Sequence, residues 1–297
     1  MKNYDFTTTA HAKWILAGEH AVIRGGPALV FPIPDKYVTL SFTQNNDPVQ
    51  ADFDAPYGET LLMFFWGILE TGLKLIEKKH SDVTGKFFWE NNIPMGGGLG
   101  FSAAFCVALA RWFMWKGWVT DDKLFEFARH LEDQFHGKSS GVDIAGAMSD
   151  KGVFFQGGAI KHTVNCEWRP HLYLSHTDSV SVTAECVSLV DELWRSNPEL
   201  AKRIDQDMAQ SVLTSERALT RNEEIGLPLL TDAIKTANLC FERWGLINST
   251  LQNHIHLLTG AGAIACKPTG AGNGGYVLSL WRQPPPDIVP IKLISAF

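Results

Sequence analysis

The chain has 297 residues, of which 45% are hydrophobic and 20% charged, and its formal net charge is -6. This balance is typical of a soluble globular protein with one large or two modest domains. An acidic chain offers no overall basic surface for nucleic acid, and the most apolar run, residues 61–69, is too short to span a bilayer.

The first third of the chain predicts strands around one long helix. Residues 7–16 alternate loosely and lead into residues 17–26, where the glycines indicate strand, turn and strand. We then expect a strand at 38–42, a polar loop at 45–56, a helix at 58–80 with apolar residues at helical spacing, and a short strand at 86–89.

Residues 93–104 are a glycine-rich stretch that we expect to open a helix over residues 102–116. Glycine leaves no Cβ in the way of a ligand, and a helix start offers unpaired N–H groups, so the stretch could hold a phosphate. A flexible glycine turn closed by a serine cap is an equally good interpretation of this stretch alone. No lysine follows the last glycine, so the stretch is not a G-x-x-x-x-G-K-[ST] loop.

A predicted helix over residues 121–135 leads into a second polar cluster. Glu132 precedes His136 by one helical turn, so the two can share a face. Asp143 follows Gly141 where a further helix is expected to begin. There it could serve equally well as an N-cap or as a general base at a cleft.

The remainder of the chain predicts strands at 152–156 and 171–176, helices at 187–195, 198–223, 228–244 and 250–259, and strand, turn, strand around the glycine-rich residues 267–275. The apolar C-terminal tail could add an edge strand. His254 and His256 face opposite sides of their helix without a third ligand, which disfavours a zinc site. Five scattered cysteines without a C-x-x-C pair, and an N-terminus without a signal-peptide pattern, favour a cytoplasmic protein.

Three stretches in fixed order, residues 13–26, 94–104 and 267–275, resemble the three motifs of the GHMP kinase superfamily. The first reads K-W-I-L-A-G-E-H-A-V and is most like the G-K-x-I-L-x-G-E-H-A-V-V of the mevalonate kinases; residues 136–143 are similar to their H-G-x-P-S-G-x-D. The resemblance spans nearly the whole chain. It implies an α+β two-domain GHMP kinase fold, with an N-terminal ribosomal-protein-S5-domain-2-like α/β domain over residues 1–170 and a C-terminal ferredoxin-like domain over residues 171–297.

The resemblance also implies a mevalonate kinase activity: transfer of the ATP γ-phosphoryl group, with Mg²⁺, to the 5-hydroxyl of mevalonate in isoprenoid biosynthesis. Asp143 would take the proton of that hydroxyl, with Lys13 beside it, and Ser102 and Glu132 would hold Mg²⁺. The ATP phosphates would lie against Gly96, Gly97, Gly98, Gly100, Ser102 and Ala103. The substrate site would include Glu19, His20, Ser140, Gly270, Ala271 and Gly272.

Four residues depart from the family pattern: Phe101, Lys138, Ser139 and Asn273. An added cation at Lys138 could favour a more anionic acceptor such as phosphomevalonate. The alternatives are therefore another GHMP kinase, with phosphomevalonate or a sugar as acceptor, or a catalytically silent nucleotide-binding protein on the same fold. The expected partners are ATP and a mevalonate-like small molecule, without nucleic acid or membrane, and a homodimer stays open because dimers are common among similar kinases.

Overall fold

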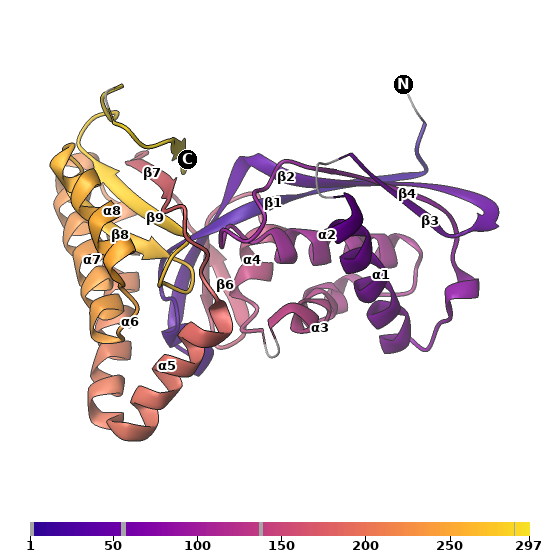
Figure 1. The fold of residues 1–297 in the computed structure, drawn as a ribbon, viewed down its shortest axis with the longest axis horizontal. Helices are drawn as coiled ribbons and strands as arrows, with labels where there is room; N and C mark the ends of the chain where they lie inside the picture. The colour runs from indigo at the N-terminus through magenta and orange to yellow at the C-terminus, as the bar shows by residue number, and fades with distance from the viewer. Residues whose placement is uncertain (1–2, 55–57, 137–138, 288) are drawn as a thin grey trace. The chain divides into compact units, whose positions relative to one another are not determined.

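The computed structural model describes residues 3–54, 58–136, 139–287 and 289–297, leaving aside the side chains of residues 135 and 136. The chain forms two compact units (Figure 1). Unit 1 comprises Met1–Ala12, Pro34–Pro94 and Gly100–Met148; unit 2 comprises Lys13–Ile33, Met95–Leu99 and Ser149–Phe297. Both units collect separate parts of the chain, and the continuous domains expected at 1–170 and 171–297 stay a prediction.

Unit 1 is a sheet with helices on one face (Figure 1). Strand β4 pairs antiparallel with the second half of β2, from Val38↔Asn91 onward, and parallel with β3. The elements of unit 1 are β1 (Phe6–Ala17) and β2 (Pro27–Pro48), which both continue into unit 2, β3 (Gln50–Asp54), α1 (Gly58–Leu75), β4 (Thr84–Asn91), α2 (Phe101–Trp115), α3 (Leu124–His136) and α4 (Val142–Met148), with short 3-10 turns at η2 (His80–Asp82) and η3 (Asp121–Lys123).

Aromatic side chains hold helix α2 against this sheet. Trp89 of β4 stacks on Phe105 of α2 with ring centroids 4.0 Å apart, and Phe87 meets Trp112 edge-on at 4.8 Å. Nearly every side chain of α2 is buried, as expected of a helix that is apolar all round. The glycine-rich stretch therefore leads into a helix whose position is fixed by the core of unit 1.

Unit 2 is built on a four-stranded antiparallel sheet of order β10-β7-β9-β8. Helices α7 and α8 cover one face of β8 and β9, and α6 packs on α7 (Figure 1). The elements of unit 2 are η1 (Ala21–Arg24), β5 (Val153–Gln156), β6 (Ala159–Thr163), β7 (His171–His176), α5 (Thr183–Ser196), α6 (Pro198–Leu219), α7 (Glu223–Arg243), α8 (Ser249–Gly260), β8 (Ala265–Thr269), β9 (Tyr276–Trp281) and β10 (Leu293–Ser295).

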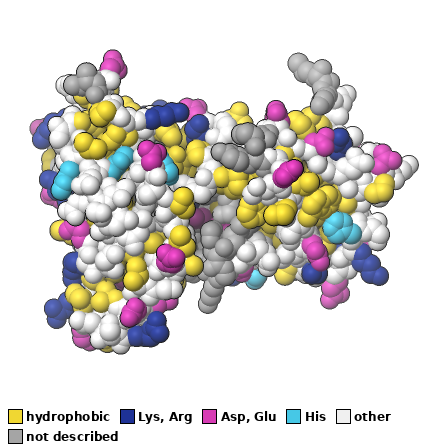
Figure 2. All heavy atoms as spheres, in the orientation of Figure 1, with side chains coloured by type: hydrophobic (Ala, Val, Ile, Leu, Met, Phe, Trp, Pro, Cys, Tyr) yellow, Lys and Arg dark blue, Asp and Glu magenta, His cyan; other side chains and the backbone are white. Residues whose placement is uncertain are grey.

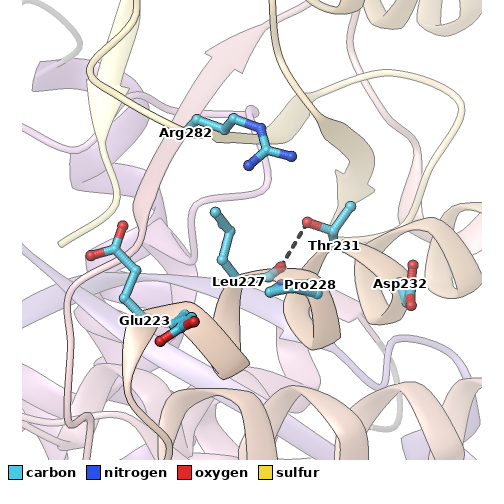
Figure 3. Close-up of a pocket in the computed structure, with 7 residues that line it drawn as sticks. Glu223, Leu227, Pro228, Thr231, Asp232 and Arg282 are labelled. Carbon is cyan, nitrogen blue, oxygen red and sulfur yellow. Dashed lines mark hydrogen bonds between the residues drawn. The ribbon is translucent and has the colours of Figure 1, made fainter.

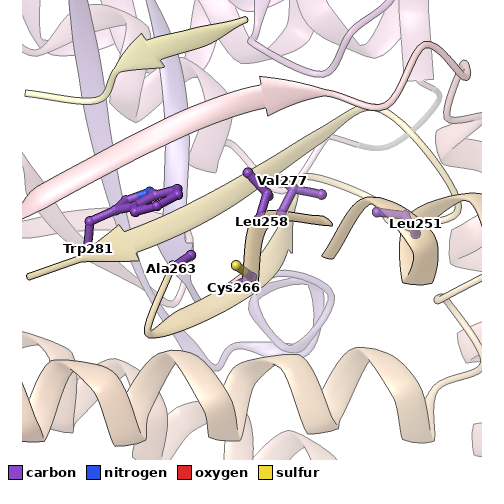
Figure 4. Close-up of a cluster of buried hydrophobic side chains, with 6 residues drawn as sticks. All are labelled: Leu251, Leu258, Ala263, Cys266, Val277 and Trp281. Carbon is purple, nitrogen blue, oxygen red and sulfur yellow. The ribbon is translucent and has the colours of Figure 1, made fainter. Parts of the chain in front are cut away.

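A buried apolar cluster joins α8 to this sheet (Figure 4). Leu251 and Leu258 come from α8, Cys266 from β8, and Val277 and Trp281 from β9, and all are at most 5% exposed. Because the cluster is apolar and buried, it holds β8 against α8 and β9. The glycine-rich residues that follow β8 therefore begin from a rigid strand.

Most predicted elements are present, and the differences have local causes. Residues 50–54 form strand β3 instead of a loop, because β4 offers a free edge with which this polar segment pairs. The helix predicted over 58–80 ends at Leu75, shortly before Glu77 adopts a φ of 56°. Residues 21–24 form a 3-10 turn instead of a strand. Residues 55–56 of the expected loop lie outside the described residues.

The surface carries charges of both signs. Figure 2 shows acidic and basic side chains interspersed over the visible face, without a large area of one sign. Among the described residues, none of the helices is long and apolar enough to cross a membrane. The C-terminal edge strand that was expected is β10, which pairs with β7.

Candidate active site

Lys13 joins the first motif to the glycine-rich stretch within unit 2. Its backbone N–H donates to the carbonyl of Leu99 at 2.9 Å, and its Nζ donates to the carbonyl of Gly98 at 3.2 Å. The side chain is only 2% exposed. The fold therefore holds a buried ammonium directly against the loop predicted to bind phosphate.

The backbone of the glycine-rich stretch needs its glycines. Gly96, Gly98 and Gly100 all have φ between 75° and 84°, where residues with a side chain are strained. A Cβ on Gly97 would lie 2.7 Å from the ring of Tyr276. The loop thus exposes backbone instead of side chains, which suits a phosphate cradle.

Helix α2 begins directly after this loop, and its N-cap is Gly100. A serine cap, the plain alternative for this stretch, is not what the structure shows. Ser102 and Ala103 lie in the first turn, where the N–H groups lack partners within the helix. Their N–H groups could thus contribute to an anion site together with the positive end of the helix dipole.

The third motif forms a tight loop between β8 and β9. Gly270 and Gly272 have φ of 99° and 93°, and a Cβ on Gly272 would lie 2.8 Å from that of Leu246. Asn273, which departs from the family pattern, has a φ of 53°. Asparagine tolerates this left-handed region better than most residues, so the departure leaves the loop conformation accessible.

Glu19 of the first motif makes a buried ion pair with Lys267 of β8. Lys267 Nζ lies 2.5 Å from Glu19 Oε1, and the two side chains are 0% and 2% exposed. Burial raises the pKa of Glu19 and lowers that of Lys267, and in each case the partner's charge opposes the shift. Glu19 Oε2 is buried and has no hydrogen-bond partner among the described residues.

His20 contacts the third motif directly. Its Nε2 lies 2.8 Å from the carbonyl oxygen of Ala271. A carbonyl only accepts hydrogen bonds, so Nε2 carries the proton and Nδ1 is an acceptor in the neutral ring. Burial lowers the pKa of His20 to about 4, which keeps the ring neutral at pH 7. Nδ1 is buried without a hydrogen-bond partner among the described residues.

The remaining site residues lie in unit 1, on helices that pack against one another. Ser102 is on α2, Glu132 on α3 and Asp143 on α4, and each pair of these helices is in contact. Asp143 is half-buried and is the second residue of α4, so it is not the N-cap of that helix. Ser140, just before α4, accepts a long hydrogen bond of 3.4 Å from the N–H of Val142.

Glu132 is buried and held by Ser139. Ser139 Oγ donates to Glu132 Oε2 at 2.5 Å and accepts from the N–H of Gly141 at 3.1 Å. The Ser139 N–H donates to Asp133 Oδ1 at 2.7 Å. Ser139 occupies the position where the mevalonate kinase pattern has proline. Its hydroxyl orients Glu132, the carboxylate predicted to bind metal. Lys138, the neighbouring departure, lies outside the described residues.

Known proteins that resemble this chain are kinases. Residues 66–151 match the family model "GHMP kinases N terminal domain". The mevalonate kinase of Methanothermobacter thermautotrophicus is 27% identical over 301 residues, which cover 92% of this chain and 89% of that protein. The mevalonate kinase of Thermococcus sibiricus is 26% identical over 298 residues, covering 92% and 88%.

Solved structures show the same fold. The crystal structure of L. major mevalonate kinase in complex with R-mevalonate gives a TM-score of 0.77 at 20% identity, covering 95% of this chain and 90% of that one. That of the Streptococcus pneumoniae phosphomevalonate kinase gives 0.72 at 15% identity, covering 98% of both chains. This chain has the GHMP kinase fold. The fold class expected from its motifs is confirmed, and so is the resemblance to the GHMP kinases.

Two residues that hold site side chains in place were not predicted from the sequence to do so. They are Lys267 and Ser139. Each acts through a partner distant in the chain or across a turn: Glu19 is 248 positions from Lys267, and Glu132 is 7 from Ser139. One sequence feature could have pointed to Lys267: it is the single charged residue in the strand β8. Such a cation in a buried strand requires an anionic partner.

The donor set of unit 1 suits Mg²⁺. A serine hydroxyl and one carboxylate are oxygen ligands of the kind that Mg²⁺ takes, with water and substrate phosphates completing the shell. The carboxylate of Glu132 is buried and oriented by Ser139, as a metal ligand requires. In the described part of the chain, no group of three or more histidine, cysteine, aspartate or glutamate side chains could hold a metal ion by itself.

The structure also contains a pocket of about 640 Å³ on α7, away from the three motifs in sequence (Figure 3). Arg282 lies across it from the first turns of α7, where Thr231 Oγ1 donates to the carbonyl of Leu227 at 2.7 Å. The lining residues are Glu223, Glu224, Leu227, Pro228, Thr231, Asp232 and Arg282. None of them belongs to the predicted site.

We expect the neutral state of His20 to make this GHMP fold sensitive to acid. The folded pKa is about 4 against an ordinary 6.5, so between these values the unfolded chain binds the extra proton. The free energy of unfolding should therefore be undiminished above pH 6.5 and fall by up to about 3 kcal/mol as the pH drops to 4. Urea unfolding at several pH values measures this.

His20→Gln is the matched control, because its side-chain amide can still donate to Ala271 but does not titrate in this range. The difference in unfolding free energy between the two proteins isolates His20 from Glu19, whose raised pKa acts in the opposite sense. Identical pH dependence in both proteins would contradict the buried neutral histidine.

Proposed function

We propose that the protein is an ATP-dependent kinase that transfers the γ-phosphoryl group of ATP to the 5-hydroxyl of mevalonate, in isoprenoid biosynthesis and in the cytoplasm. The observation that carries this proposal is the pair of buried acceptors on the first motif, Glu19 Oε2 and His20 Nδ1. An ionised carboxylate and a neutral imidazole nitrogen accept hydrogen bonds, so they suit an acceptor with hydroxyl groups. Mevalonate has two hydroxyls beside its carboxylate.

The relatives support the same choice of acceptor. The mevalonate kinases that the chain resembles align over 92% of it, at 26% and 27% identity. A site whose buried acceptors await hydroxyl donors discriminates strongly against molecules without them, because those acceptors would stay unpaired. The acceptor is thus selected by polar groups that the fold holds in place without a ligand.

Each remaining site residue has a role in this reaction. Asp143 accepts the proton of the substrate hydroxyl, and Lys13 neutralises charge on the transferred group. The loop from Gly96 to Gly100, with Ser102 and Ala103, holds the ATP phosphates through backbone N–H groups. Ser140 and the backbone of Gly270, Ala271 and Gly272 shape the acceptor site.

Ser102 and Glu132 are the residues that would hold Mg²⁺. When bound, the metal supplies charge neutralisation on the β- and γ-phosphates, which is most of what phosphoryl transfer needs besides positioning. The contribution of the chain is to fix the ligands: Glu132 is buried on α3 and held by Ser139, and Ser102 lies in the first turn of α2.

The experiment that tests this function is ADP release from Mg-ATP with mevalonate, phosphomevalonate, galactose or homoserine as acceptor. We expect a kcat/KM for mevalonate at least about 100-fold above that for each of the others. Homoserine lacks the second hydroxyl, phosphomevalonate carries an added charge, and galactose is a ring without a carboxylate. Preference for phosphomevalonate or galactose would keep the kinase and replace the acceptor. ATP binding without ADP release would leave a silent nucleotide-binding protein.

A further inference from the structure

We propose that Lys267 is a positioning residue of the acceptor site: it fixes one oxygen of Glu19 and leaves the other for a hydroxyl of the acceptor. The inference rests on the proposed function, since it assigns Glu19 to the acceptor. Lys267 belongs to the third motif in sequence, but its side chain serves the first.

The first step is that the Lys267 ammonium has a fixed position. Nζ lies 2.5 Å from Glu19 Oε1 and 3.3 Å from the carbonyl oxygen of Ile15, and 5.4 Å from the ring centroid of Phe241. The strand that carries it is buried throughout and paired with β9, Lys267 opposite Leu278. An ammonium with two hydrogen-bond acceptors and an aromatic face has one favourable location.

The second step is that β8 is locked to β1 next to this pair. Thr269 lies two residues after Lys267 and therefore on the same face of the strand. Its Oγ1 accepts from the N–H of Ile15 at 3.0 Å and lies 3.0 Å from the Ile15 carbonyl oxygen. Glu19 lies four residues after Ile15, so the contacts of Thr269 hold β8 and the first motif together.

The third step is the unequal treatment of the two carboxylate oxygens. Oε1 accepts from Lys267, whereas Oε2 is buried without a hydrogen-bond partner among the described residues. Buried polar atoms are nearly always paired, so an exception requires an explanation. A hydroxyl of the acceptor is the group that would pair with this oxygen. His20, the next residue in the chain, has its Nδ1 in the same condition among the described residues.

Stability alone does not explain the pair. Replacing a buried ion pair with apolar or neutral groups of similar volume is often neutral or stabilising, because desolvation offsets the attraction between the charges. A pair that joins two motifs and leaves one carboxylate oxygen open is better explained by positioning. Removing both charges together should therefore preserve the fold and still damage the site.

The test compares Lys267→Met, Glu19→Gln and the double variant with the wild type. Lys161→Met, on the exposed strand β6, is the matched control. We expect Lys267→Met and Glu19→Gln each to lower kcat/KM for mevalonate about 10- to 100-fold, chiefly through KM, with the KM for ATP nearly unchanged. The double variant should melt close to the wild type and lose no more kcat/KM than the more damaged single variant, because both changes remove one interaction.

Three results would overturn the inference. One is multiplicative loss of kcat/KM in the double variant, which would mean that Lys267 acts independently of Glu19. Another is a Lys267→Met protein that is less stable but has the kcat/KM of the wild type when folded, which would leave a structural role only. If the wild type itself does not phosphorylate mevalonate, the proposed function fails and this inference fails with it.

Discussion

We expect Asp143→Asn to lower kcat for mevalonate phosphorylation by about 100- to 10,000-fold, the usual range for a lost general base, and to retain ATP binding. The amide has the shape of the carboxylate but cannot take a proton at neutral pH. Asp143 is the second residue of α4 and not its cap, so the substitution should leave the helix intact. Single-turnover rates together with the Kd of a non-hydrolysable ATP analogue measure both quantities.

The control for this variant is Asp133→Asn, which alters a carboxylate on α3 that accepts from the Ser139 N–H. It should lower kcat far less than Asp143→Asn, because it affects proton transfer only indirectly. Full activity in the Asp143→Asn protein would remove Asp143 from the reaction. A loss of ATP binding in step with activity would instead indicate a role in folding.

We expect Lys13→Met to lower kcat by about 100- to 1000-fold, the size of effect seen when one preorganised charge-stabilising group is removed. The methionine side chain has nearly the same length, so it fills the buried space that the lysine leaves. Because Lys13 Nζ also donates to the carbonyl of Gly98, we expect a smaller, separate weakening of ATP binding through the glycine-rich stretch. Rapid-quench kinetics and equilibrium ATP binding separate the two effects.

Lys13→Arg distinguishes charge from geometry. It keeps the positive charge, but a guanidinium is too large for a side chain that is 2% exposed, so activity should recover only in part. If Lys13→Met changes kcat by less than about threefold, the ammonium does not stabilise the transferred group. In that case its role would be structural, through contacts such as the one with Gly98.

The sequence predicted those parts of the fold that depend on local pattern. The helical spacing of apolar residues predicted α1 and α2, and clustered glycines predicted the loops at 96–100 and 270–275 because only glycine takes their positive φ angles readily. Local sequence pattern gave wrong predictions where hydrogen bonds to another segment or to a capping side chain determine the secondary structure. Strand β3 is polar and forms only because β4 offers its edge. Helix α7 begins at Glu223 instead of Pro228, since the Asn222 side chain caps it by accepting from the N–H of Ile225.

The sequence predicted which motifs form the candidate site, but not which side chains contact one another within it. Glu19 and His20 stand out in the sequence, whereas the partners that set their charge and tautomer, Lys267 and Ala271, are about 250 residues away. Ser139 hydrogen-bonds Glu132 across the end of a helix, a contact that depends on how the chain turns. Side-chain pairing across such separations is a consequence of tertiary packing, which no single-sequence pattern reports.

The central claim is that this protein phosphorylates mevalonate on its 5-hydroxyl. Its most direct test is ³¹P NMR of the protein incubated with Mg-ATP and mevalonate. We expect loss of the γ-phosphorus resonance of ATP and growth of a phosphomonoester resonance coupled to the C5 methylene protons. Inorganic phosphate as the only new signal besides those of ADP, or a phosphomonoester that forms only with a different acceptor, would contradict it.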